Sequence, residues 1–140
     1  MIKAYIDCNI LIDWLLDREP FSLYAAKIIE LIDEEKIIGY VSALTLANTY
    51  FIIAKELNRK IADEFLKDSL TIFRFTDMNE KTIGLAIEKK YKDFEDDLHY
   101  FAVLGSGLDF LITRNKKDFK NQGIRIVDSE EFLKIIVNGA

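Results

Sequence analysis

Acidic and amide side chains follow two short apolar runs of this sequence, and they are residue types that bind hard metal ions. Asp7 directly follows the run 2–6, Asn115 stands just after the run 110–113, and three acids occupy 95–97. Apolar runs that stop at a polar residue are typical of buried parallel strands, and ligands bind beyond the carboxyl ends of such strands. Oxygen ligands gathered there would suit a hard divalent cation.

An alternation of strands and helices would bring these residues to the carboxyl ends of neighbouring strands. Apolar periodicity, capping residues and breakers locate the elements along the chain. The predicted strands are 2–6, 37–41, 71–75, 110–113 and 124–127, and the predicted helices are 10–15, 21–34, 42–57, 61–70, 77–90, 93–104 and 128–136. This order predicts an α/β fold with a mostly parallel sheet of about five strands, covered by helices on both faces.

The connections of such a sheet bring three distant positions to one edge. Crossovers between parallel strands are right-handed, so a helix that feeds a strand begins at the carboxyl edge of the sheet. Asp96 begins the helix that feeds the strand 110–113, and it should therefore approach Asp7 and Asn115. The helix 42–57 begins at the same edge and would bring Thr45 and Asn48 as further oxygen donors.

Each candidate ligand also has an ordinary structural explanation. Asp7 could cap the following helix, and Asn9 could be a turn residue or could orient Asp7. Asn115 could be a loop residue, with Asp118 as a carboxylate that assists or replaces it. His99, the single histidine, is expected to be a partly exposed helix residue, because hydrolysis by metal ions needs no imidazole.

The acids at 93–97 exceed what helix capping needs. Acids near a helix N-terminus are favoured by the helix dipole without any function, but four acids in five positions repel one another unless a cation neutralises them. Helical periodicity, with Phe94 and Leu98 in the core-facing stripe, places Asp97 closer to that stripe than Asp96.

Composition sets further bounds. A chain of 140 residues that is 50% apolar is expected to form a single domain over 1–140. No apolar stretch approaches the roughly 18 residues of a membrane span, and no targeting peptide is recognisable, so a cytoplasmic location is expected.

Cys8 is the single cysteine, which excludes an internal disulfide. A net charge of −5 argues against a broad nucleic-acid-coating surface, although Arg114, Lys116 and Lys117 make a local basic segment around Asn115.

Three short motifs match a known family in order and spacing. They are Asp-Cys-Asn-Ile-Leu-Ile-Asp at 7–13, Glu-Asp-Asp-Leu-His at 95–99 and Ile-Thr-Arg-Asn-Lys-Lys-Asp-Phe at 112–119. With these motifs the chain resembles the PIN domain family, and especially the small single-domain VapC-type toxins, from end to end. The resemblance implies a compact three-layer α/β/α fold and a ribonuclease that depends on Mg²⁺ or Mn²⁺.

The resemblance also assigns the site residues. It selects Asp96 rather than Asp97 as the family's acid, because Asp97 stands at the usual alanine position. Asn48 stands where the family's second motif carries Glu, and Asn115 is neutral where many members carry Asp. Two of the four family ligand positions therefore lack charge, and Glu95, Asp97 or Asp118 would have to compensate.

The predicted mechanism follows from these assignments. Asp7 and Asp96 would hold one ion, with Asn115, Asn48 and waters completing its oxygen shell and Asp118 or Asp97 available for a second ion. The predicted supporting residues are Asn9, Thr45, Asn48, Glu95 and Thr113, and the predicted phosphate contacts are Arg114, Lys116 and Lys117. The resemblance further implies an RNA substrate, a small antitoxin partner and a homodimer.

Two other interpretations stay open at this point. A PIN-like module with a depleted acid cluster could bind RNA or a partner protein without cleaving RNA. An aspartyl-phosphate phosphatase or receiver would also begin with an acid after the first strand. Phosphatases of that class need a second acid at position 9, where this chain has Asn9, so this interpretation is disfavoured.

Overall fold

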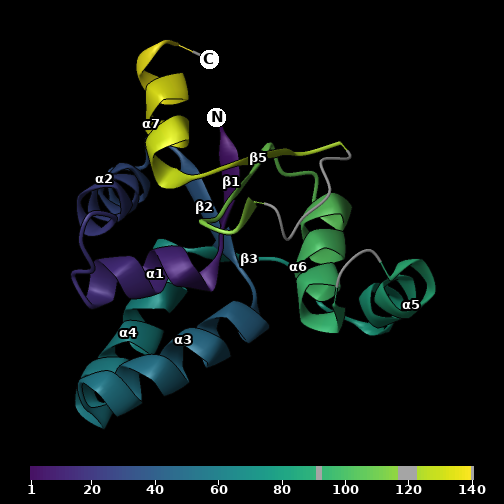
Figure 1. Cartoon of the computed structure of the whole chain (residues 1–140), viewed down its shortest axis with the longest axis horizontal. Coiled ribbons are helices and arrows are strands. Elements are labelled where there is room, and N and C mark those ends of the chain that lie inside the picture. The colour runs from purple at the N-terminus through teal and green to yellow at the C-terminus, as the bar shows by residue number, and fades with distance from the viewer. Residues whose placement is uncertain (91–92, 117–122, 140) are drawn as a thin grey trace.

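The structure is a computed structural model that describes residues 1–90, 93–116 and 123–139. Its centre is a five-stranded parallel sheet in the order β3-β2-β1-β4-β5 (Figure 1). The strands are β1 Lys3–Ile6, β2 Ile38–Val41, β3 Arg74–Phe75, β4 Phe110–Ile112 and β5 Arg125–Val127. Because β1 is the middle strand, its carboxyl end lies between those of β2 and β4.

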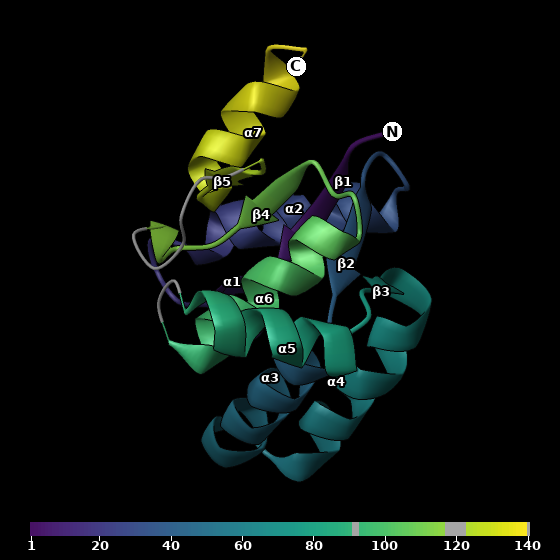
Figure 2. The same cartoon turned by 90° about the vertical axis from the view of Figure 1, so that its right-hand side faces the viewer.

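Helices cover both faces of this sheet, which confirms the predicted α/β/α architecture (Figures 1 and 2). The helices are α1 Cys8–Leu15, α2 Ser22–Asp33, α3 Ala43–Glu56, α4 Arg59–Ile72, α5 Glu80–Lys89, α6 Phe94–Gly105 and α7 Ser129–Val137. Helices α1, α2 and α7 lie on one face and α6 lies on the other, with α5 packed on α6 and α3 paired with α4. Among the described helices, none has the length and apolar character that crossing a membrane requires.

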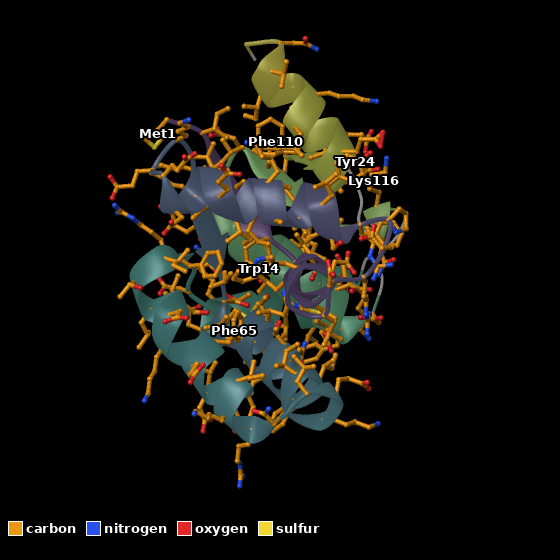
Figure 3. The ribbon with its side chains drawn as sticks, turned by 90° about the vertical axis from the view of Figure 1, so that its left-hand side faces the viewer. Met1, Trp14, Tyr24, Phe65, Phe110 and Lys116 are labelled. Carbon is orange, nitrogen blue, oxygen red and sulfur yellow. The ribbon has the colours of Figure 1, made fainter. Side chains whose placement is uncertain are left out.

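The alternation of side chains along β1 separates two cores. Ala4 and Ile6 point into a large cluster with α1, α2, α4 and α7, whereas Tyr5 points to the opposite face beside Val103 of α6. Figure 3 views the first cluster from the side of α2 and labels Phe65 and Phe110, two of its buried members. Residues 4–6 of β1 and all of β4 are apolar and buried because helices cover both faces of the sheet there.

Most element boundaries match the predicted ones, but two predictions are wrong. Helix α4 extends to Ile72, so the strand predicted at 71–75 shortens to Arg74–Phe75. In this last turn the Thr71 hydroxyl donates to the backbone carbonyl of Asp68 within the helix. Helix α5 begins at Glu80 rather than at the predicted residue 77, because Asn79 and Thr82 form its capping box.

Candidate active site at the carboxyl edge of the sheet

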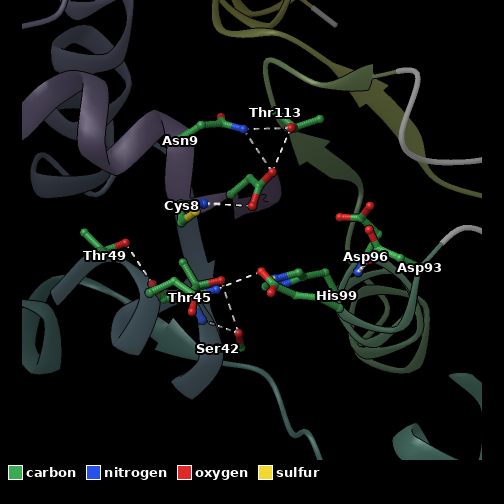
Figure 4. A network of polar contacts seen from close by, with 12 residues as sticks. Cys8, Asn9, Ser42, Thr45, Thr49, Asp93, Asp96, His99 and Thr113 are labelled. Atoms are coloured by element: carbon green, nitrogen blue, oxygen red, sulfur yellow. Dashed lines mark hydrogen bonds and ion pairs between the residues drawn. The ribbon is translucent and has the colours of Figure 1, made fainter. Parts of the chain in front are cut away.

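Asp7 is fixed at the carboxyl end of the central strand. Its backbone N–H extends the pairing of β1 with β4 by donating to the carbonyl of Ile112, and its side chain caps α1 by accepting from the N–H of Cys8 at 2.8 Å. Its other carboxylate oxygen, Oδ2, accepts from Thr113 Oγ1 at 2.8 Å and from Asn9 Nδ2 at 3.2 Å (Figure 4). With a residue exposure of only 8%, this carboxylate is oriented almost entirely by protein donors.

The segment after β4 is tied to the start of α1. Thr113 Oγ1 accepts from the backbone N–H of Asn115 at 3.1 Å, and the side-chain oxygen of Asn9 accepts from the backbone N–H of Arg114 at 3.2 Å. These contacts hold Asn115, an exposed residue, close to the residues that orient Asp7. Two predicted site residues lie outside the described residues: Lys117, a predicted phosphate contact, and Asp118, a predicted metal ligand.

The acids of the third motif lie in the first turn of α6. Asp93 is the N-cap and accepts from the N–H of Asp96 at 2.9 Å, while Asp96 is half-buried and Asp97 is buried (Figure 4). Phe94 was expected in the core-facing stripe, but it is 52% exposed, so this prediction is wrong. The buried face of α6 begins only at Asp97, because the first turn provides cap contacts rather than core contacts.

His99 is buried, contrary to the expectation of a partly exposed residue. It retains 2% exposure, and its Nδ1 lies 2.7 Å from the hydroxyl of Tyr5. That hydroxyl also lies 2.8 Å from Ser42 Oγ and 2.8 Å from Thr45 Oγ1. Burial raises the pKa of Tyr5, so it stays protonated and can donate one hydrogen bond. A polar partner in the middle of the sheet therefore allows an imidazole to be buried.

A second contact joins α3 to α6. Asn48 Nδ2 donates to Glu95 Oε1 at 2.9 Å, and the same carboxylate oxygen lies 3.8 Å from His99 Nε2. Thr45 is fully buried and its hydroxyl contacts Tyr5, so it holds the start of α3 in place. The neutral Asn48 thus has an acid from α6 beside it.

Arg114 is anchored by a buried acid that sequence analysis missed. Its Nε lies 2.8 Å from Oδ2 of Asp13, a residue with no exposed surface. The direction of this N–H does not meet hydrogen-bond geometry, so the contact is an ion pair held by charge. Burial raises the pKa of Asp13, and the Arg114 charge opposes that rise. An acid within the apolar helix α1 is the signal that could have revealed this pair.

Lys116 is held by acids at the start of α7. Its ammonium group contacts Glu131 Oε1 at 2.5 Å and lies 3.8 Å from Asp128 Oδ2. The hydrogen bond with Glu131 raises the pKa of Lys116. Of the predicted phosphate contacts, Arg114 and Lys116 therefore each have an acidic partner within the protein.

The residues at this edge form an oxygen-rich donor set. In the part of the chain that the structure describes, no three His, Cys, Asp or Glu side chains are grouped closely enough to hold a metal ion. Mg²⁺ is commonly held by one or two carboxylates together with waters and substrate phosphates, and it needs no complete protein cage. The carboxylates of Asp7 and Asp96 are the type of ligand that such an ion takes, whereas a zinc site would need imidazole or thiolate ligands.

Comparison with known proteins places this architecture in a family. The sequence model of the PIN domain matches residues 3–117. Ribonuclease VapC1 from Aquifex aeolicus is 26% identical over 135 residues, which cover 93% of this chain and 92% of that protein.

Solved structures share the fold at lower identity. A toxin-antitoxin complex from Klebsiella pneumoniae contains a chain with a TM-score of 0.67 and 21% identity, covering 90% of this chain and 97% of its own. PAE2754 from Pyrobaculum aerophilum has a TM-score of 0.64 and 17% identity, covering 97% of this chain and 96% of its own. Since the family match runs through most of the sequence, the chain belongs to the PIN domain family.

Proposed function

We propose that this chain is a metal-dependent endoribonuclease and the toxin of a toxin-antitoxin pair. The observation that carries the proposal is the carboxylate of Asp7, which is held by donors from α1 and from Thr113 at the carboxyl edge of the sheet. The similarity to a protein named Ribonuclease VapC1 over nearly the whole chain supports the same reaction.

In this proposal Asp7 and Asp96 hold Mg²⁺ or Mn²⁺, with Asn115 and Asp118 as further oxygen ligands. Asp97 is a further acid that is available for a second ion. The bound ion supplies positive charge that lowers the pKa of a coordinated water and offsets charge on the attacked phosphate. Thr113 and Asn9 keep the Asp7 carboxylate in one orientation, because both donate to its Oδ2.

Glu95 is proposed as the acid that compensates for the neutral Asn48. The hydrogen bond from Asn48 Nδ2 holds one carboxylate oxygen of Glu95. A carboxylate has two oxygens and about four acceptor sites, so it can accept this bond and still face a cation. The Glu95 side chain is 57% exposed and is therefore open to substrate and solvent.

The proposed substrate is RNA with accessible bases. Its phosphates are proposed to contact Arg114, Lys116 and Lys117. A small antitoxin and a second copy of the chain are the proposed partners, and the cytoplasm is the proposed compartment. Support for the antitoxin comes from fold neighbours that include the toxin-antitoxin complex from Klebsiella pneumoniae and VapBC2 from Rickettsia felis. The fold and these neighbours do not favour a module without catalytic activity over a ribonuclease.

Replacement of Asp7 by Asn tests the proposal. Purified wild-type protein should cleave single-stranded RNA with Mg²⁺ or Mn²⁺ and stop when EDTA is added. Asp7→Asn should lower the rate by at least about a hundredfold, because the ion loses a charged ligand. Asp33→Asn at the exposed end of α2 is the matched control and should behave as wild type. Unchanged cleavage by the Asp7→Asn protein would overturn the proposal.

A further inference from the structure

A cavity of about 360 Å³ lies next to the proposed site, between the start of α2, the segment after β4 and the start of α7. We infer that it receives one unpaired nucleobase of the RNA, adjacent to the phosphate that is cut. This inference rests on the proposed ribonuclease function. The volume is near the lower end of the roughly 300 to 1,000 Å³ of small-molecule sites, which suits a single planar group.

Two hydrogen bonds connect the cavity to Asp7. Asn115 lines the cavity, and its backbone N–H donates to Thr113 Oγ1 at 3.1 Å. Thr113 in turn donates to Asp7 Oδ2 at 2.8 Å. A phosphate held by the proposed ion at Asp7 would therefore have a neighbouring nucleotide within reach of the cavity.

The cavity contains a rigid planar surface. Phe21, which is 37% exposed, lies with its ring 4.4 Å from the guanidinium carbon of Arg114. The buried Asp13 holds Arg114 from behind at 2.8 Å. Unpaired bases of RNA stack on aromatic rings and on guanidinium planes, and both surfaces are present here in a fixed position.

The polar groups of the cavity favour a base over a phosphate. Asp128 and Glu130 lie at its α7 side. Glu130 is hydrogen-bonded to Tyr24 of α2 and accepts from Lys134 Nζ at 3.2 Å, and Asp128 Oδ2 lies 3.8 Å from Lys116 Nζ, so each carboxylate keeps only its remaining acceptor sites for a ligand. Two carboxylates repel a phosphate, but they accept hydrogen bonds from the exocyclic amines of adenine, cytosine and guanine. The geometry therefore favours a base that carries an amine over uracil.

The inference can be tested by cleavage of short single-stranded RNAs in which the position beside the cut is randomised. Wild-type protein should prefer an amine-bearing base at that position. Phe21→Ala should lower kcat/KM on the preferred RNA by about tenfold and should reduce the preference, because stacking is lost. Glu130→Gln should weaken the discrimination against uracil. Phe51→Ala, which removes a 68% exposed ring from α3, is the matched control and should leave the cleavage profile unchanged.

Binding measurements separate this inference from the proposed function. The Asp7→Asn protein should quench the fluorescence of a 2-aminopurine base in a short RNA, and the quenching should be lost when Phe21→Ala is added. Quenching that depends on Phe21, found together with a wild-type protein that cleaves no RNA, would support the cavity and refute the ribonuclease proposal. Phe21→Leu keeps the apolar bulk, so it tests the ring if Phe21→Ala fails to fold.

Cleavage without base preference, together with wild-type behaviour of Phe21→Leu, would overturn the inference while leaving the ribonuclease proposal intact. Equal losses in the Phe21→Ala and Phe51→Ala proteins with an unchanged preference would also overturn it. If the Phe21 variants keep RNA affinity but lose a bound small protein, the cavity is a protein site and the inference is wrong.

Discussion

The hydroxyl of Thr113 donates a hydrogen bond to the carboxylate of Asp7 at 2.8 Å, across 106 positions of sequence. The two residues stand at the carboxyl ends of the neighbouring strands β1 and β4, whose register pairs Ile6 with Ile112. The orientation of the proposed catalytic carboxylate is therefore set by strand pairing.

Removal of this hydroxyl should impair catalysis. Thr113→Val keeps the shape of the side chain but loses the donor, so we expect kcat/KM for RNA to fall about tenfold as Asp7 loses its orientation. A stability loss of about 1 kcal/mol should accompany it, measured by urea unfolding. Thr113→Ser retains the donor and should recover most of the activity. Equal activity of the Val and Ser variants would show that this hydrogen bond does not matter for cleavage.

Loss of the Glu95 charge should weaken metal binding. Glu95→Gln should lower the affinity for Mn²⁺ about tenfold in calorimetric titration, because a carboxylate near the ion is replaced by an amide. Glu88→Gln makes the same change at an exposed position of α5 and should leave the affinity unchanged. If the Glu95→Gln and Glu88→Gln proteins bind Mn²⁺ equally, Glu95 does not compensate for Asn48.

The Tyr5 hydroxyl should contribute to stability. Tyr5→Phe removes a group that contacts Ser42, Thr45 and His99, all of them buried, and leaves their polar atoms short of a partner. We expect a loss of about 1 to 3 kcal/mol in the free energy of unfolding. Tyr40→Phe on the adjacent strand is the control, with an expected change within about 0.5 kcal/mol. Similar losses in both variants would argue against a special role for the Tyr5 network.

A side chain at Gly39 should destabilise the protein. A Cβ atom there would lie 2.5 Å from Ile32 Cδ1 and 3.2 Å from Phe73 Cδ1. We therefore expect Gly39→Ala to destabilise the protein by about 1 to 3 kcal/mol. At Gly84 in α5 a Cβ meets nothing within 4 Å, so Gly84→Ala should stabilise the helix by up to about 1 kcal/mol. Unfolding curves that shift in the same direction for both variants would contradict this contrast.

Cys8 should be unreactive near neutral pH. Burial, and secondarily the charge of Asp7, raise the pKa of its thiol to about 12 from the ordinary 9.0. The folded protein therefore holds the proton more tightly than the unfolded chain, and this contribution to stability should be lost as the pH rises from 9.0 towards 12. Alkylation at pH 8 should be far slower in the folded protein than in urea. A folded-state rate that levels off near pH 9 would contradict the raised pKa.

Sequence analysis could predict the position of Asp7 and Thr113 because strand ends depend on local apolar runs. The handedness of crossovers then placed the start of α6 at the same edge. These inferences need only the order of strands and helices along the chain, which can be predicted from the periodicity of apolar residues.

The polar contacts between elements could not be predicted in the same way. The burial of His99 depends on the hydroxyl of Tyr5, which comes from a strand 94 positions away. The ion pair between Asp13 and Arg114 likewise depends on how α1 packs beside the segment after β4. Such contacts depend on how the elements pack in three dimensions. Helical periodicity describes one helix at a time, so it cannot predict the partner of a polar side chain on another element.

The central position of β1 also has a consequence for how the chain matures. On a ribosome β1 emerges first, yet β4 and Thr113, its partners on one side, are translated late in the sequence. Parallel pairing over such separations forms slowly and only after both strands are available. A nascent chain would therefore carry Asp7 without its orienting hydroxyl until synthesis is well advanced.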